Sequence, residues 1–277
     1  MLGISAMVPE DELSLRQMNS HADYVQCVEL QKETWEREFS EIVPPSILMV
    51  SQKLGGVVAG AFDSQGKMIG FVFGMTGLRD GRVAHWSDML AIRVSCRDRG
   101  VGLRLKLFQR ELLLGMDIET VFWTFDPLVA RNAHFNLNRL GVEVVEYVPN
   151  MYAEDATNEL SRGLGMDRFV VKWNIASDRV KRILAEKDRS AGTRPTAPIV
   201  NSGAAVSAGE FPDSDAVLIE IPADIQIVRE RSLAEAAQWR TSTRQAFTWY
   251  LDHGFRVTGF YREANRAFYY LMKTSHD

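Results

Sequence analysis

The sequence contains little that would build a metal site or a set of cross-links. Only two cysteines, Cys27 and Cys96, occur among 277 residues, which is too few for a cysteine-ligated zinc site or a disulfide framework. No apolar run reaches the roughly 20 residues that cross a bilayer. Residues 1–12 show no basic stretch followed by an apolar core, so no signal peptide is expected. These absences predict a cytoplasmic protein with no metal centre and no membrane partner.

An excess of positive charge is missing as well. The 32 Lys and Arg residues face 36 Asp and Glu residues, for a net charge of −4, so nucleic acid is not expected as a partner. Hydrophobic residues make up 46% and charged residues 25% of the chain, which is typical of a soluble globular protein. A length of 277 residues predicts one domain with an appendage, or two small domains.

What the sequence does contain is a glycine loop between a strand and a helix. The alternation in residues 85–94 predicts a strand with one face made by Trp86, Asp88, Leu90, Ile92 and Val94. After the loop, helical spacing predicts a stripe made by Val101, Leu105, Phe108 and Leu112. The first N–H groups of a helix have no partner within it and carry a partial positive charge. Glycines 100 and 102 let the backbone come close to a bulky anion. The segment therefore predicts a phosphate site.

Two common nucleotide motifs do not fit this loop. A Rossmann loop needs G-x-G-x-x-G, but Gly100-Val101-Gly102 is followed by Leu105 at the third position. A P-loop needs G-K-[ST], which does not occur here. An ordinary strand-to-helix turn, with glycines for tightness, is the remaining alternative to a phosphate site.

The residues Arg97-x-x-Gly100-x-Gly102, preceded by Leu90-Ala91-Ile92, resemble the pyrophosphate motif of the GNAT acetyltransferase superfamily. The resemblance implies an α/β (α+β) fold with a mixed sheet, in the order strand, helix, helix, three strands, helix, strand, helix, strand, strand. Apolar periodicity gives the same order over residues 12–175, about 60% of the chain. The resemblance also implies an N-acyltransferase whose cofactor is acetyl-CoA or another acyl-CoA, and in which an amine attacks the thioester directly.

The resemblance further implies that the cofactor is bound mainly by the backbone. The main chain of Leu90 and Ile92 would hold the pantetheine arm. The pyrophosphate would lie on the N–H groups of Arg97, Asp98, Arg99, Gly100, Val101, Gly102 and Leu103. Asn132 and Asn136, one helical turn apart, are predicted to bond the amides of the cofactor arm. Capping of the helix N-terminus is the alternative for Asn132.

Asp88 is the predicted general base, because members of the superfamily carry a Glu or His at this place on the central strand. The alternatives are an ion pair with Arg93 or Arg79, or a capping role at a bulge, since structural ion pairs also perturb carboxylates. His85, on the opposite face, is expected to be a partly exposed histidine at the start of the strand.

The general acid departs from the family pattern. Many relatives carry a tyrosine four residues before the glycine that ends the helix after the proline-broken strand, and that position is Leu137 here. Tyr152 is the predicted donor, with simple packing of its ring, and protonation of the thiolate by water, as alternatives. Asp167 and Arg168 precede and begin a strand, where the arginine fork could hold a substrate carboxylate. A salt bridge within the turn is the alternative.

Composition divides the chain into three parts. Residues 1–187 are predicted to form the acyl-CoA-binding domain, and residues 188–216, rich in Ser, Gly, Ala, Pro and Thr, a flexible linker. Residues 217–277 predict a strand, a helix opened by the capping box Ser232-Leu-Ala-Glu235, and a hairpin. This last part is too small to bury a core alone. It is expected to dock on the first domain or on a second chain, which is compatible with a homodimer. Its many aromatic residues could roof an acceptor pocket or form a core.

Three functions are compatible with these observations. The leading hypothesis is acyl transfer to the amine of a small metabolite. A catalytically silent GNAT-fold module that holds an acyl-CoA is favoured by Leu137 in place of the tyrosine and by the structural alternatives for Asp88. A protein-amine acetyltransferase is the third, and it would require an open peptide groove.

Overall fold

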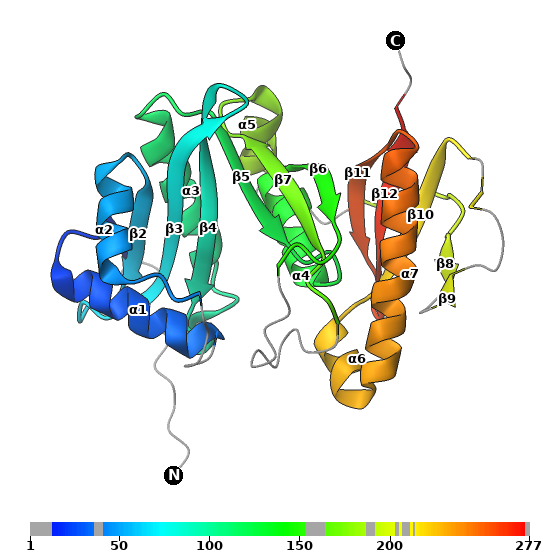
Figure 1. Ribbon diagram of the computed structural model, residues 1–277, viewed down its shortest axis with the longest axis horizontal. Helices are drawn as coiled ribbons and strands as arrows, with labels where there is room; N and C mark the ends of the chain where they lie inside the picture. The colour runs from blue at the N-terminus through cyan, green and yellow to red at the C-terminus, as the bar shows by residue number, and fades with distance from the viewer. Residues whose placement is uncertain are drawn as a thin grey trace. The chain divides into compact units, whose positions relative to one another are not determined.

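The computed structural model describes residues 13–35, 41–152, 164–186, 192–202, 205–206, 211–212 and 214–274. The chain forms two compact units, Met1–Val121 and Phe122–Asp277, whose elements are labelled in Figure 1. This division differs from the predicted boundaries at residues 187 and 217. Among the described residues, no helix combines the length and apolarity needed to cross a bilayer.

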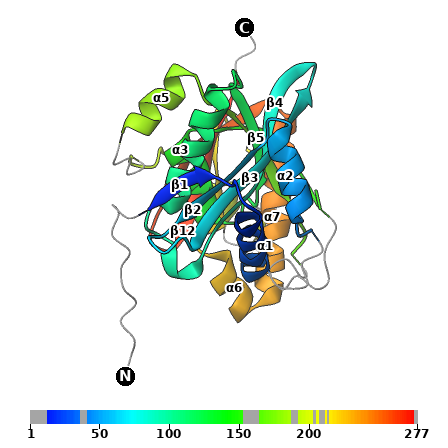
Figure 2. The ribbon, with the colours of Figure 1, turned by 90° about the vertical axis from the view of Figure 1, so that its left-hand side faces the viewer.

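The first unit is a sheet with helices on both faces. Its strands lie in the order β1 (Ser14–Gln17), β2 (Val57–Phe62), β3 (Met68–Arg79) and β4 (Arg82–Ile92), each antiparallel to the next. Figure 2 shows one face covered by α1 (His21–Trp35) and α2 (Pro45–Lys53) and the other by α3 (Val101–Leu114). All six residues of β2 are buried, as expected of a strand covered on both faces.

A bulge in β4 changes which side chains share a face. Phe73 pairs with Met89, but the next residue, Gly74, pairs with Ser87, so Asp88 is an extra residue on β4. A bulge of this kind re-aims the side chains that follow it. Met89 joins the core formed with α1, while Leu90 lies 3.9 Å from the position of a Cβ on Gly102 of α3. The prediction of one continuous face from Trp86 to Val94 was therefore wrong.

The second unit begins within β5 (Thr120–Phe125), which lies in the sheet order β5-β7-β6. Its other elements before residue 186 are α4 (Ala130–Ala133), the π-helix η3 (His134–Leu140), β6 (Glu143–Val148), β7 (Arg168–Asn174) and α5 (Asp178–Ala185). The predicted helix at residues 131–140 is thus a short α-helix that widens into a π-helix. Together with the first unit, these elements follow the predicted order of strands and helices, which confirms the predicted α/β fold class.

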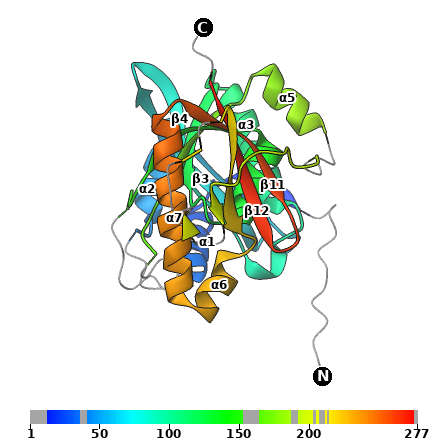
Figure 3. The same ribbon diagram turned by 90° about the vertical axis from the view of Figure 1, so that its right-hand side faces the viewer.

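The C-terminal part of this unit is a three-stranded antiparallel sheet in the order β10-β12-β11, against which α7 packs (Figure 3). The elements are β10 (Ala216–Pro222), α6 (Ile225–Arg231), α7 (Leu233–Asp252), β11 (Phe255–Arg262) and β12 (Arg266–Lys273). The predicted cap is confirmed, because the Ser232 hydroxyl accepts a hydrogen bond from Glu235 N at 3.2 Å. Helix α6 was not predicted.

An aromatic cluster explains why the C-terminal residues belong to the second unit. The ring of Phe169 on β7 lies 5.6 Å from Tyr147 on β6, 4.7 Å from Phe247 on α7 and 5.5 Å from Tyr269 on β12. Phe169, Phe247 and Tyr269 are fully buried. Most aromatic residues of the C-terminal part are therefore core residues, and this part docks on β6 and β7, as one of the two predicted alternatives had it.

The predicted flexible linker is partly ordered. Val200 N donates to Leu218 O at 3.0 Å, and the side chain of Asn201 bonds both the N–H and the C=O of Glu220 at 2.8 Å. These bonds place β8 (Asn201–Ser202) beside β10, and β8 pairs with β9 (Ala205–Val206). The prediction was wrong here because one asparagine side chain substitutes for a strand partner. Residues 187–191, 203–204, 207–210 and 213 lie outside the described residues.

Candidate functional site

The glycine loop connects β4 to α3 within the first unit. After β4 the chain makes the 3₁₀ turn η2 (Val94–Cys96), and then Asp98 and Gly100 adopt left-handed backbone angles, with φ of 62° and 73°. Glycine adopts this conformation without strain. The hydrogen bond from Arg104 N to Gly100 O, at 3.1 Å, is the first that α3 makes. The N–H groups of residues 101–103 therefore precede the helical ladder and carry its partial positive charge, which suits an anion.

The predicted phosphate-binding residues do not all contribute in the same way. Arg97 N donates to Val94 O at 3.3 Å and Arg97 Nε to Ile92 O at 3.2 Å. The predicted role of the Arg97 N–H is corrected by this bond, because the 3₁₀ turn already uses that donor. Asp98, Arg99 and Gly100 are exposed. The donors that match the prediction best are those of Val101, Gly102 and Leu103.

Asp88, the predicted base, is the extra residue of the β4 bulge. Its side chain is exposed, yet enough protein surrounds the carboxyl that desolvation raises its pKa, and the charge of Glu41 adds to the rise. The Trp86 indole donates to the carboxylate and opposes this shift. The predicted alternative of an ion pair with Arg93 does not hold, because Arg93 pairs with Glu33. A carboxyl with a raised pKa is suited to proton transfer near neutral pH.

His85 belongs to a chain of buried polar side chains between β3, β4 and α3. The ring is fully buried, so the prediction of a partly exposed histidine was wrong. Its Nδ1 lies 3.0 Å from Thr76 Oγ1 and its Nε2 lies 3.0 Å from Gln109 Nε2. Gln109 Oε1 accepts from Lys106 Nζ at 2.8 Å and from Ser87 Oγ at 3.1 Å. The chain ties α3, which carries the glycine loop at its N-terminus, to the strand segment next to Asp88.

The charge states in this chain follow from its bonding. Gln109 Nε2 can only donate, so His85 Nε2 accepts and the ring is neutral with its proton on Nδ1. Burial and the nearby Lys106 lower the pKa of His85 to about 3, and burial lowers the pKa of Lys106 to about 7. Sequence reasoning missed both groups. Lys106 and Gln109 lie on the buried face of α3. The predicted stripe placed Phe108 and Leu112 on that face, but both are only half-buried.

The two predicted asparagines lie in different environments of the second unit. Asn136 is buried, and its Oδ1 accepts from Trp123 Nε1 at 3.1 Å. Asn132 is exposed. The N-cap of α4 is Val129, so the capping alternative for Asn132 was wrong. A joint role of the two side chains on a cofactor arm stays a prediction.

Asp167 and Arg168, the predicted substrate-binding pair, are not bonded to each other through their side chains. Asp167 is fully buried, and its carboxylate accepts from Arg244 Nη2 at 2.5 Å, Tyr147 OH at 2.5 Å and Asn150 N at 3.0 Å. This leaves Asp167 a structural role, with a partner from α7 that no local pattern indicated. The prediction that it contacts substrate is corrected accordingly.

Arg168 lies beside Tyr152, the predicted proton donor. The guanidinium is 5.5 Å from the centre of the Tyr152 ring, and Tyr152 OH lies 3.3 Å from Thr124 Oγ1 on β5. Arg168 Nη1 is 3.8 Å from Asp126 Oδ2. The structure thus brings Arg168 and Tyr152 together at the end of β5, although they were predicted for separate roles.

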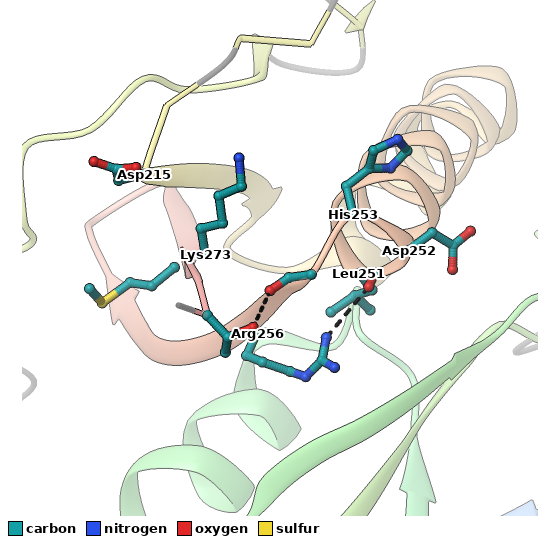
Figure 4. A pocket seen from close by; sticks show the side chains of 9 residues that line it. Asp215, Leu251, Asp252, His253, Arg256 and Lys273 are labelled. Carbon is teal, nitrogen blue, oxygen red and sulfur yellow. Dashed lines mark hydrogen bonds between the residues drawn. The ribbon is translucent and has the colours of Figure 1, made fainter. Parts of the chain in front are cut away.

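A pocket of about 790 Å³ lies at the carboxyl end of α7 (Figure 4). Its lining includes Asp215, His253, Arg256 and Lys273. Arg256 Nη1 donates to Leu251 O at 3.5 Å, and cations are favourable near the partial negative charge of a helix C-terminus. This contact accounts for the position of Arg256, and no predicted site residue is among those that line the pocket.

Comparison with known proteins gives matches among solved structures alone. No family model and no curated protein matches the chain. An acetyltransferase of the GNAT family from Streptococcus pneumoniae is 16% identical, covers 58% of this chain and 98% of its own, and has a TM-score of 0.47. A chain of the NatC complex bound to Gag peptide and CoA is 13% identical, covers 59% of this chain and 98% of its own, and has a TM-score of 0.47. The ribosomal-protein-S18-alanine N-acetyltransferase from Escherichia coli is 14% identical, covers 60% of this chain and 95% of its own, and has a TM-score of 0.45.

The chain is therefore similar in fold to these N-acetyltransferases over 58–60% of its length. At TM-scores of this size the likeness adds nothing about activity.

Proposed function

We propose that the protein is an acyl-CoA-dependent N-acyltransferase of the GNAT superfamily that acts on the amine of a small metabolite. One observation carries the proposal, namely the loop at the N-terminus of α3. Its left-handed Gly100 and the N–H groups of residues 101–103 provide an anion site directly after β4. The residues quoted in the resemblance, Arg97-x-x-Gly100-x-Gly102, occupy this loop.

The residues of this loop fit an acyl-CoA. The N–H groups of Val101, Gly102 and Leu103 would hold the pyrophosphate, and the exposed Arg99 adds positive charge. Gly102 keeps the surface of the loop free of a side chain. The main chain of Leu90 and Ile92 would hold the pantetheine arm. When bound, an acyl-CoA supplies the acyl group as an activated thioester.

Asp88 would accept the proton that the ammonium form of the acceptor must lose. Its raised pKa brings the carboxyl nearer to the pH at which proton transfer to and from an amine is efficient. The Trp86 indole would hold the carboxylate in place. Tyr152 is the proposed donor to the leaving thiolate, with its hydroxyl oriented by Thr124.

Thermal unfolding with and without acetyl-CoA tests the proposal. A ligand at a hundred times its Kd adds roughly 2.7 kcal/mol to the free energy of unfolding, so the midpoint of thermal unfolding should rise. Dephospho-CoA and adenosine diphosphate show which part of the ligand is responsible. Gly102→Asp should abolish the rise, because the nearest side-chain atom to a Cβ at this position is 3.9 Å away and the new carboxylate would repel the phosphates. Gly77→Ala serves as the control.

An amine library screened for acylation then tests turnover. Acylation that depends on Asp88 supports the enzyme, whereas tight binding with no acylation of any amine supports a silent binding module. No rise in midpoint at millimolar acetyl-CoA, with the protein folded, would mean that the loop is only a turn.

A further inference from the structure

Among the described residues of the second unit, three arginines and two carboxylates form a cluster at the end of β5 and the start of β7. The arginines are Arg168, Arg240 and Arg244, and the carboxylates are Asp126 and Asp167. Two of the arginines come from α7, so the cluster forms only when the C-terminal segment is folded. The cluster carries one positive charge more than its carboxylates balance.

The hydrogen bonds assign the excess charge to Arg168. Arg240 takes both oxygens of Asp126, at 2.9 and 2.6 Å, and Arg244 takes both oxygens of Asp167, at 2.5 and 2.9 Å. Arg168 has weaker partners. It donates to the backbone oxygen of Asp167 at 3.0 Å and to the sulfur of Met166 at 3.7 Å, and its Nη1 stays 3.8 Å from Asp126.

Arg168 is also poorly solvated for a cation. Its side chain is only 17% exposed, and desolvation lowers the pKa of its guanidinium. A buried charge is costly unless an opposite charge and hydrogen bonds compensate it. The Arg168 guanidinium lies next to the ring of Tyr152, whose hydroxyl is 3.3 Å from Thr124 Oγ1. A fork with spare N–H donors can receive an acidic group, while the Tyr152 hydroxyl remains the proposed donor to the leaving thiolate.

We infer that Arg168 binds a carboxylate on the acceptor, so that the substrate is an amine that also carries an acid group. The excess of one charge matches a carboxylate, whereas a phosphate monoester carries nearly two negative charges at neutral pH. A carboxylate also matches the planar fork of an arginine in a bidentate arrangement. This inference rests on the proposed function only in naming the ligand as the acceptor.

Binding is tested directly, without turnover. Saturation-transfer NMR on the full chain compares small amino acids with their primary carboxamides, which keep the amine and lose the acid. At least one amino acid should bind, and its amide should bind about tenfold to a hundredfold more weakly, the range expected for a hydrogen bond to a charged group. Equal binding of acid and amide, or binding of neither series, overturns the inference.

Variants locate the effect. Arg168→Gln should weaken the acid to the level of the amide, and Arg168→Lys should retain part of the preference, because the charge remains but the fork is lost. Arg229→Gln on α6, where the arginine contacts Gln226 at 3.4 Å, is the matched control and should bind like the wild type. If Arg168→Gln binds the acid as the wild type does, the assignment is wrong. The acid–amide comparison on the wild type decides the case even if a variant fails to fold.

The same panel separates the two proposals. Selective binding of an acid with no acetyl-CoA-dependent product would overturn the proposed function and retain the anion site. Acylation of the amino acids and of their primary carboxamides at equal rates would retain the proposed function and overturn the anion site.

Discussion

Arg240 and Asp126 are separated by 114 residues in the chain and joined by two hydrogen bonds of 2.9 and 2.6 Å. The same guanidinium donates from Nε to Leu164 O at 3.0 Å. One side chain of α7 therefore holds the residue after β5 and the segment before β7. The C-terminal segment is part of the frame that positions Arg168 and Tyr152.

Arg240→Ala should lower the free energy of unfolding by about 3 kcal/mol, because it removes the bidentate partner of a largely buried carboxylate and leaves only the longer contact to Arg168. Arg240 is 5% exposed and Asp126 is 23% exposed, so the loss falls toward the lower end for buried pairs. Urea unfolding measures it. The matched control is Arg231→Ala, which breaks an exposed pair with Glu235 and should cost less than about 1 kcal/mol. Equal losses for the two variants would contradict the structural role of Arg240.

Neither partner of Arg240 could have been found from the sequence. Local periodicity gave the strand that precedes Asp126 and the capping box at Ser232, because those patterns depend on neighbouring residues. The ion pair between Arg240 on α7 and Asp126 after β5 depends on tertiary packing, in which Phe169 on β7 meets Phe247 and Tyr269. Periodicity reports that a face is apolar and not which other face covers it.

The glycines of β3 provide a second prediction. A Cβ on Gly74 would lie 2.3 Å from His85 Nε2 and 2.5 Å from Trp86 O, whereas a Cβ on Gly77 would meet nothing within 4 Å. Gly74→Ala should therefore cost about 2 kcal/mol or more, since it forces the bulge and the buried histidine apart. Gly77→Ala should be neutral or slightly stabilising. Urea unfolding of the pair checks this, and equal effects would contradict the close approach at Gly74.

The buried ring of His85 predicts a loss of stability in acid. The native state keeps the ring neutral, with its pKa lowered to about 3, while the unfolded chain binds a proton near pH 6.5. The contribution of His85 is therefore complete above pH 6.5 and is lost as the pH falls toward 3. One proton of difference gives a slope of up to about 1.4 kcal/mol per pH unit. Urea unfolding between pH 6.5 and 4 measures this slope.

His85→Phe separates titration from packing. The variant loses the bonds to Thr76 and Gln109 at every pH, so it is less stable than the wild type at pH 7. Its stability should nevertheless fall less steeply in acid, because it has no ring to protonate. Parallel curves for variant and wild type would show that His85 does not titrate on unfolding.

The bulge at Asp88 shows why the site was predicted only in part. The residue types of the loop and the carboxylate on β4 were apparent from the sequence, since a resemblance of this kind depends on residue identity. Strict alternation then assigned Asp88 and Leu90 to one face. In the register of β3 against β4, Asp88 is an extra residue. That register depends on the partner strand, and the alternation within one strand carries no information about its partner.

Asp88→Asn should lower kcat by roughly a hundredfold to ten-thousandfold, the usual range for a general base, with little change in acyl-CoA binding. It should also raise the thermal midpoint at pH 7. The native pKa of Asp88 is raised by desolvation and by Glu41, so ionisation of this carboxyl destabilises the fold. The penalty is fully present above the native pKa and disappears below the pKa of the unfolded chain.

The gain in midpoint should therefore shrink as the pH falls, and the activity of the wild type should fall with it as the base becomes protonated. Asp80→Asn, in the exposed turn between β3 and β4, is the matched control and should change neither property. A variant that loses activity and stability together would indicate that Asp88 supports the bulge. Loss of activity together with a gain in stability at neutral pH would mean that the ionised Asp88 destabilises the fold and is needed for the reaction. A purely structural group would not show both changes.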